Sequence, residues 1–321
     1  MFTSSYSRIV PKMALLLCCS AGAFSAHAQD AQQEDDAKPK DVEVITVKPG
    51  EPNSSIYEER ILSDKEANEN LFSMSQHWPN YILPVSHVSD PNSITLDGEG
   101  EEVIDNLEAK YQISVKTPLW THNDDFSGLY FGFTAMSLWQ LYNSETSKPF
   151  RETNYEPELF YMFDTDIKIL GYQFNLMQIG LNHQSNGQNG LKSRSWNRIT
   201  VSALFSDEDT AYFVRTWYRI PEDDKEFPLD PRGDDNPDIN DYYGRIEIGF
   251  SAQFGRSTVT TRLRNNLRFD DNRGGIEINY TYPINARYDF LIQYFNGYGD
   301  SLIDYNRHQK RISAGVQLKF L

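Results

Sequence analysis

The sequence predicts an all-β fold: a transmembrane antiparallel β-barrel of twelve strands, of the outer-membrane type. From about residue 80 to the C-terminus, apolar and polar residues alternate with a period of two. No run of eighteen apolar residues follows the N-terminus, which excludes helical membrane spans. Aromatic residues make up 13% of the chain, as is typical of barrels with aromatic girdles.

The charge balance limits the possible partners. Lys and Arg number 30 against 46 Asp and Glu, which gives a formal net charge of −16. A surface that neutralises phosphates would need the opposite sign. We therefore expect no nucleic-acid partner.

Residues 1–28 are predicted to be a secretory signal peptide. A positively charged start and a short apolar core precede a small-residue cleavage site at Ala26-His27-Ala28. Both cysteines, Cys18 and Cys19, lie inside this segment, so the mature chain has no thiol for disulfides or catalysis. Residues 29–70 are charged, rich in Pro and Gln, and without apolar period, which predicts a flexible periplasmic lead-in.

The barrel is expected to occupy residues 71–321. Its first strand is Asn80–Val88, in which Pro84 is the one unfavourable residue. In the last strand Ile312, Ala314 and Val316 alternate with polar or small neighbours, so each face has one character. Eleven further strands show such alternation, near 107–118, 128–141, 154–164, 171–184, 195–206, 210–220, 242–253, 257–268, 274–283, 287–298 and 308–321.

Connection lengths orient this barrel. With twelve strands both termini lie in the periplasm, and outer-membrane barrels have long outer loops and short inner turns. The long connections then fall outside, at 89–106, 142–153, 185–194, 221–241 and 299–307. The short ones fall inside, at 165–170, 207–209, 254–256 and 284–286.

The stretch that bridges two of these strands contains a possible catalytic set. In a strand, His183 and Ser185 share a face about 7 Å apart, a spacing that suits a base and its nucleophile. A hairpin centred on Gly190 pairs His183 with Asn197, about 5 Å away between Cβ atoms. Asn197 could then fix the tautomer of the imidazole, as the carboxylate does in a serine triad.

The parity of the strands directs this set outward. His183 continues one apolar face and Asn197 begins another. Both faces are expected to meet lipid, at Met177, Ile179, Leu181, Ile199, Val201, Ala203 and Phe205. A soluble substrate in the lumen would not reach the site, whereas a phospholipid beside the barrel would, near the extracellular leaflet. The ordinary alternative is that His-x-Ser is incidental and that the Asn-Gly pairs form turns.

Longer motifs favour the catalytic interpretation. They are Asn-His-Gln-Ser-Asn-Gly and Ser-Arg-Ser-Trp-Asn-Arg within 182–198, Pro-Phe-Arg-Glu-Thr-Asn-Tyr-Glu-Pro at 149–157, and Gly-Tyr-Gly-Asp-Ser-Leu-Ile-Asp-Tyr at 297–305. Together they resemble the outer membrane phospholipase A family, from about Leu107 to the C-terminus. The resemblance implies a twelve-stranded barrel that hydrolyses acyl esters of phospholipids and lysophospholipids, with A1, A2 and lysophospholipase specificity.

The resemblance also implies roles for individual residues. Ser185 is then the nucleophile, His183 the base and Asn197 the orienting residue. Active members of the family are homodimers that bind Ca²⁺. The implied ligands are the Ser193 hydroxyl, the Gln188 backbone carbonyl and the partner subunit's Ser147, and hard Ca²⁺ prefers such oxygen ligands.

Two residues depart from the family pattern. Gln188 stands where an Arg is often found, which matters little if only its carbonyl binds. Ala135 stands where relatives have a polar dimer contact, so the strength of the dimer is less predictable than catalysis.

Other clusters receive structural interpretations. A polar lumen network is expected from Arg151, Glu152, Tyr155 and Glu158. The loop 221–241 carries nine acidic residues and is expected to be solvated. Two other functions fit a barrel: a passive porin, which conductance would reveal, and a non-enzymatic surface barrel such as an adhesin, whose loops would carry the binding.

Overall fold

A computed structural model describes residues 74–319, apart from residues 96, 123–125, 170 and 208. The expected signal peptide (1–28) and the expected lead-in (29–70) lie outside these residues and stay predictions. Within the described residues thirteen strands form one sheet. They are β1 (Ser75–Gln76), β2 (Asn80–Val88), β3 (Leu107–Thr121), β4 (Gly128–Trp139), β5 (Phe150–Ile169), β6 (Tyr172–Ser185), β7 (Ser195–Ser206), β8 (Thr210–Ile220), β9 (Ile246–Phe254), β10 (Ser257–Asn265), β11 (Gly274–Pro283), β12 (Tyr288–Gly297) and β13 (Gln309–Leu318).

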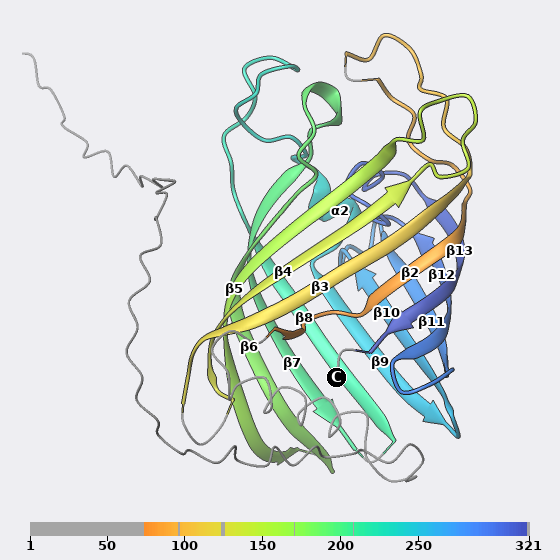
Figure 1. Cartoon of the computed structure of the whole chain (residues 1–321). Coiled ribbons are helices and arrows are strands. Elements are labelled where there is room, and N and C mark those ends of the chain that lie inside the picture. Colours follow the sequence, from red (N-terminus) through yellow and green to blue (C-terminus); the bar gives the residue numbers. More distant parts are fainter. Residues whose placement is uncertain (1–73, 96, 123–125, 170, 208, 320–321) are drawn as a thin grey trace, which may run out of the picture. The chain divides into compact units, whose positions relative to one another are not determined.

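Strands β2 to β13 close into a twelve-stranded antiparallel barrel (Figure 1). Each strand pairs with its neighbours in sequence, and β2 also pairs with β13, with Val88 opposite Arg311. The two-residue strand β1 pairs with β3 beyond the end of β2. The predicted barrel is therefore confirmed, with its largest error at β5, which extends past the expected 154–164 at both ends.

The connections differ between the two ends of the barrel (Figure 1). One end has the long loops, at 89–106, 140–149, 186–194, 221–245, 266–273 and 298–308. The other has the shorter turns, at 122–127, 170–171, 207–209, 255–256 and 284–287. Two short helices lie in the long loops: the one-turn 3-10 helix η1 (Gly190–Lys192) and α2 (Ile239–Tyr242). No helix of the described residues is long and apolar enough to cross a membrane.

Side chains alternate between the lumen and the outer face as the pleat requires. In β13, Ile312 is 57% exposed on the outside, whereas its neighbours Arg311 and Ser313 are almost fully buried inside. The outer face is thus apolar and the inner face polar. This arrangement is the reverse of a soluble protein and suits a barrel surrounded by lipid.

Ion pairs fill the lumen. Arg262 Nη2 lies 2.9 Å from Glu247 Oε1, and Arg215 pairs with Glu158. Because a buried charge is costly unless it is paired, these contacts permit a charged interior. A cavity of about 110 Å³ remains among them, with Lys110 in its wall. Such a space holds a few water molecules and forms no wide channel.

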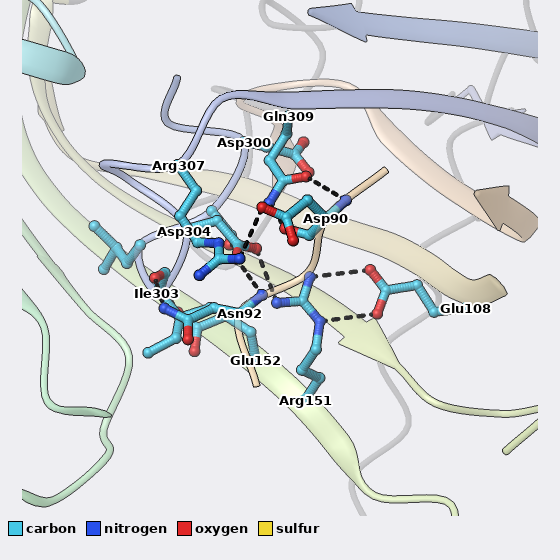
Figure 2. Close-up of polar contacts among 12 residues, drawn as sticks. Asp90, Asn92, Glu108, Arg151, Glu152, Asp300, Ile303, Asp304, Arg307 and Gln309 are labelled. Carbon is cyan, nitrogen blue, oxygen red and sulfur yellow. Dashed lines mark hydrogen bonds and ion pairs between the residues drawn. The ribbon is translucent and has the colours of Figure 1, made fainter. Parts of the chain in front are cut away.

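A second network connects the loops to the barrel wall (Figure 2). Arg151 donates from Nε and Nη2 to the two oxygens of Glu108, at 3.0 and 3.1 Å, and from Nη1 to Asp304, at 2.8 Å. Asp304 also accepts from the Asn92 backbone N–H at 2.9 Å. Arg311 Nη1 reaches Glu108 at 2.8 Å. Two chain segments more than two hundred residues apart in sequence are thereby joined.

The expected polar network is correct for three residues and wrong for Tyr155. The ladder pairs Leu138 with Glu152 and Trp139 with Phe150, so Arg151 is the extra residue of a bulge. Arg151 and Glu152 are both buried for this reason. From Glu152 onward the alternation is regular, which puts Tyr155 on the outer face, 42% exposed.

Arg311→Met tests the contribution of the lumen network. Arg311 contacts Glu108, Asp300 (2.6 Å from Nε) and Ser86. Its removal leaves buried carboxylates short of a partner, so we expect a loss of about 3–5 kcal/mol in the free energy of unfolding. Denaturant titration in detergent, followed by tryptophan fluorescence, measures this.

Lys310→Met, at the exposed neighbouring position of β13, is the matched control for the loss of one cation. It should change the free energy of unfolding by less than about 0.5 kcal/mol. Equal small changes in the two variants would contradict a stabilising role for Arg311.

Candidate active site

The β6–β7 hairpin brings the expected base and orienting residue together. His183 lies directly opposite Asn197 in the ladder, which is the register expected from the sequence. His183 Nδ1 is 2.9 Å from Asn197 Oδ1. Because an amide oxygen only accepts hydrogen bonds, Nδ1 donates the proton and Nε2 keeps a free lone pair. The hydrogen bond therefore fixes the tautomer of the imidazole, with the proton on Nδ1.

Ser185 is the last residue of β6 and shares the face of His183. It pairs with Ser195 of β7 and with Tyr155 of β5, and it is half-buried. No hydrogen bond joins Ser185 to His183 in the described part of the chain. Catalytic hydrogen bonds are often long before a substrate binds. The hydroxyl and the imidazole thus lie on the same face, two residues apart along β6, without a hydrogen bond between them.

This face is the outer one. Ile179 and Leu181 precede His183 by four and two residues and lie on the same face. They are 42% and 55% exposed. Asn182 and Gln184 alternate with them and are buried in the lumen. The imidazole therefore opens toward the surroundings of the barrel, at the end of β6 that leads into a long loop.

Asn186 organises the β6–β7 loop (186–194). Its side-chain Oδ1 accepts from the backbone N–H groups of Gln188, at 3.3 Å, and Arg194, at 2.9 Å. Its Nδ2 donates to the Lys192 carbonyl at 2.8 Å. Its own backbone N–H bonds to the Arg194 carbonyl at 3.0 Å. One buried side chain thus fixes both arms of the loop.

Glu152 anchors this organiser to the lumen. As the residue after Ser185, Asn186 points inward, where its Nδ2 donates to Glu152 Oε2 at 3.2 Å. The other oxygen of Glu152 accepts from the Ile303 backbone N–H at 3.1 Å. Glu152 and Ile303 belong to the group drawn in Figure 2. The β6–β7 loop and the 298–308 loop are thereby connected through a single carboxylate.

The acidic loop (221–241) folds against the start of β7. Ser193 Oγ donates to Asp235 Oδ2 at 2.7 Å, and Lys225 Nζ lies 2.6 Å from Asp235 Oδ1. The expectation that this loop is solvated is therefore wrong for part of its length. Its acidic residues make specific contacts beside the hairpin.

Two further contacts extend this interface along β7. Asn236 Oδ1 accepts from the Ser195 backbone N–H at 3.0 Å. Glu222 Oε1 accepts from Asn197 Nδ2 at 3.0 Å. The acidic loop thus reaches Asn197, the residue expected to orient the imidazole.

Electrostatics in the loops above the barrel follow from burial and pairing. Burial alone would raise the pKa of Asp300, but Arg311 and Lys110 outweigh it and hold that pKa below its usual value. Burial raises the pKa of Tyr305, as does its hydrogen bond to Asp238 at 2.6 Å. At neutral pH Asp300 is thus charged and Tyr305 neutral.

The residues expected to hold Ca²⁺ offer oxygen atoms. Gln188 and Ser193 lie on the same short loop, whose fold Asn186 fixes. Ser147 is exposed in the 140–149 loop. Among the described residues no group of three or more His, Cys, Asp or Glu could hold a metal. A hydroxyl and a carbonyl nevertheless suit hard Ca²⁺.

Sequence comparison decides the family. The profile of the phospholipase A1 family matches residues 57–318. The chain belongs to the phospholipase A1 family. Phospholipase A1 of Escherichia coli K12 is 34% identical over 258 residues, covering 80% of this chain and 85% of that protein. The phospholipase A1 of Klebsiella pneumoniae is 35% identical over 256 residues, covering 79% and 85%.

Solved structures agree with this assignment. An active-site mutant of outer membrane phospholipase A from Escherichia coli superposes with a TM-score of 0.70 at 33% identity, covering 81% of this chain and 97% of that one. The Salmonella typhi outer membrane phospholipase, a dimer with bound calcium, gives a TM-score of 0.69 at 32% identity, with the same coverages. The phospholipase is thus a phospholipid ester hydrolase and a β-barrel of the Gram-negative outer membrane.

Sequence reasoning missed two side chains around the site, Asn186 and Glu222. Asn186 had a signal, because an inward Asn next to an outward Ser begins the loop. Glu222 had one too, since it continues the period of β8 two residues past Ile220, which lies opposite Asn197. Glu152 was expected in the lumen, but its hydrogen bond to Asn186 depends on three-dimensional packing and had no signal in the sequence.

Asn186→Ala should loosen the β6–β7 loop. Losing its buried side-chain hydrogen bonds costs about 1–3 kcal/mol, enough to raise the open population of the loop about fivefold or more. Trypsin should then cut after Lys192 or Arg194 faster by about fivefold or more in the folded phospholipase. Asn189→Ala, at an exposed position whose side chain caps nothing, is the control and should leave the rate unchanged. Wild-type cleavage of Asn186→Ala would show that the loop holds its shape by other means.

Proposed function

We propose that this phospholipase is calcium-dependent and cleaves acyl ester bonds of phospholipids and lysophospholipids through Ser185, His183 and Asn197. The observation that carries the proposal is the His183–Asn197 hydrogen bond on the outer face, with Ser185 two residues along the same strand. A base oriented in this way beside a hydroxyl is the arrangement that serine hydrolases use.

The chemistry follows from these groups. His183 Nε2 takes the proton from Ser185 as its Oγ attacks the ester carbonyl carbon. The protonated imidazole then gives that proton to the glycerol oxygen as the ester bond breaks, which leaves an acyl-serine. Water, deprotonated by the same imidazole, releases the fatty acid and restores Ser185. Asn197 keeps the ring oriented throughout.

The outward position suits a substrate held in the membrane. Ile179, Leu181 and Ile199 flank the site with exposed apolar surface, against which acyl chains can lie. At the end of β6 that carries the long loops, the hydroxyl would stand at the depth of the ester bonds in the outer leaflet. The buried ion pairs of the lumen weigh against the alternative of a passive porin, because a wide water-filled pore would leave these charges exposed.

Calcium fits the oxygen donors of the site. The Ser193 hydroxyl and the Gln188 carbonyl would hold the ion, with the partner subunit's Ser147 completing the set in a homodimer. When bound, Ca²⁺ supplies a positive charge that polarises the ester carbonyl and stabilises the oxyanion. The calcium-bound dimer of the Salmonella typhi relative supports this assignment.

Ser185→Ala should abolish hydrolysis without unfolding the barrel. Removal of an activated nucleophile lowers the rate by about 10³-fold or more. A phospholipid hydrolysis assay in detergent with calcium measures this, and the heat-resistant electrophoretic form reports folding. Ser202→Ala, which changes another serine of the hairpin strands, should keep the wild-type rate. Unchanged hydrolysis by Ser185→Ala would remove this serine from the mechanism.

Calcium and dimerisation should depend on each other. If two subunits share the ion, calcium tightens the dimer by the same free energy with which the dimer tightens calcium. Ala135 offers no polar contact, so we expect a weak dimer in chelator and a stronger one in calcium. Sedimentation in detergent should show this difference for wild type and for Ser144→Ala, the control in the same loop. Ser147→Ala should show little of it, and calcium-independent association of the wild type would refute the shared site.

A further inference from the structure

The acidic loop (221–241) puts a carboxylate behind the orienting asparagine. Glu222 Oε1 accepts from Asn197 Nδ2 at 3.0 Å, while Asn197 Oδ1 faces His183 Nδ1 at 2.9 Å. Three side chains are therefore linked by hydrogen bonds, from imidazole to amide to carboxylate, and Ser185 lies two residues from His183 on the same strand face. Glu222 is half-buried, so this contact is shielded from bulk water on part of its surface.

The β-ladder explains why the contact forms. Asn197 lies opposite Ile220, the last residue of β8. Glu222 follows two residues later and so stays on the same outer face, diagonal to Asn197, within reach of a long side chain. Pro221, between Ile220 and Glu222, has no backbone N–H to donate, and the β7–β8 ladder ends at Ile220.

The direction of these hydrogen bonds matters for the base. A carboxylate accepts only, so the face of the amide toward Glu222 must be its NH₂ group. That choice forces the amide oxygen toward His183, which in turn places the imidazole proton on Nδ1. If the amide rotated by 180°, its oxygen would face the carboxylate oxygen and its NH₂ group would donate to Nδ1, which would put the ring proton on Nε2 and leave no lone pair there for a base.

We infer that Glu222 is a positioning residue: it locks the Asn197 amide and, through it, places negative charge behind the imidazolium that forms during hydrolysis. The inference rests on the proposed function. A neutral asparagine orients the imidazole but cannot stabilise its positive charge as the triad carboxylate does. Glu222 supplies a negative charge behind Asn197, one side chain further from the imidazole than the carboxylate of a serine triad.

Other titratable groups on neighbouring elements do not replace it. Tyr155 of β5 lies on the same face, opposite Ser185, and offers a phenol and no carboxylate. Asp235 in the acidic loop contacts Ser193 and is paired with Lys225. On β7 the facing side chains are uncharged. Glu222 is thus the carboxylate bonded to the orienting residue.

Two substitutions at this position separate orientation from charge. Glu222→Gln retains an acceptor oxygen for Asn197 Nδ2 but loses the charge, whereas Glu222→Ala loses both. We expect Glu222→Ala to lower kcat about tenfold with little change in KM, and Glu222→Gln to recover most of that loss above neutral pH. Without the carboxylate the imidazolium is less stable, so the acid limb of kcat/KM should move to lower pH in both variants.

The assay uses the full-length phospholipase in detergent with saturating calcium, across pH 5–9. Glu226→Gln removes one charge from an exposed position of the same loop and should leave kcat and the acid limb unchanged. Wild-type kcat and an unshifted limb in both Glu222 variants would overturn the inference. Equal losses in both variants with an unshifted limb would also overturn it, since the effect would not pass through the imidazole.

Ser185→Ala and His183→Ala in the same assay keep the two proposals apart. If these variants are inactive and the Glu222 variants behave as wild type, the inference fails and the proposed function stands. If Ser185→Ala hydrolyses phospholipid normally, the proposed function itself fails, whatever the Glu222 variants do.

Discussion

The fold and the site both depend on closure of a single antiparallel ladder. In hydrocarbon no water can satisfy an unpaired backbone group, so the pairing of β2 with β13 is what lets the sheet exist in a membrane. Once the ladder is closed, the side chains of each strand point alternately toward the lipid and toward the lumen, because successive residues of a strand lie on opposite faces. Ion pairs gather inside because of that assignment, and His183 faces outward for the same reason.

Neighbouring residues consequently serve opposite sides of the wall. Ser185 faces outward with the imidazole, whereas Asn186 faces inward and is held by Glu152. The reactive surface is thus positioned from within, by a lumen whose contacts extend to Ile303 and the loops above the barrel. The buried hydrogen bonds of Glu152 to Asn186 and Ile303 therefore support the outward-facing residues of the hairpin.

Most of the strands and the His183–Asn197 register were predictable, because alternation and hairpin spacing are local properties of the sequence. Tyr155 was misassigned because a bulge at Arg151 shifts the parity of β5, and a bulge leaves no mark in an alternating pattern. The contacts of Glu222 and Asp235 arise where a loop folds back on β7, which depends on three-dimensional packing. Composition alone made that loop look solvated.

The seam between the first and last strands also sets the order of assembly. Ser86 and Ser313, bonded across it at 2.8 Å, are 227 residues apart in the chain. A contact of such high sequence separation carries a large loop-closure entropy and forms late. Until β13 arrives, β2 and β12 both present open edges that can pair with another chain. The unfinished barrel is therefore the species most prone to aggregation, until the ten residues of β13 have docked between β12 and β2.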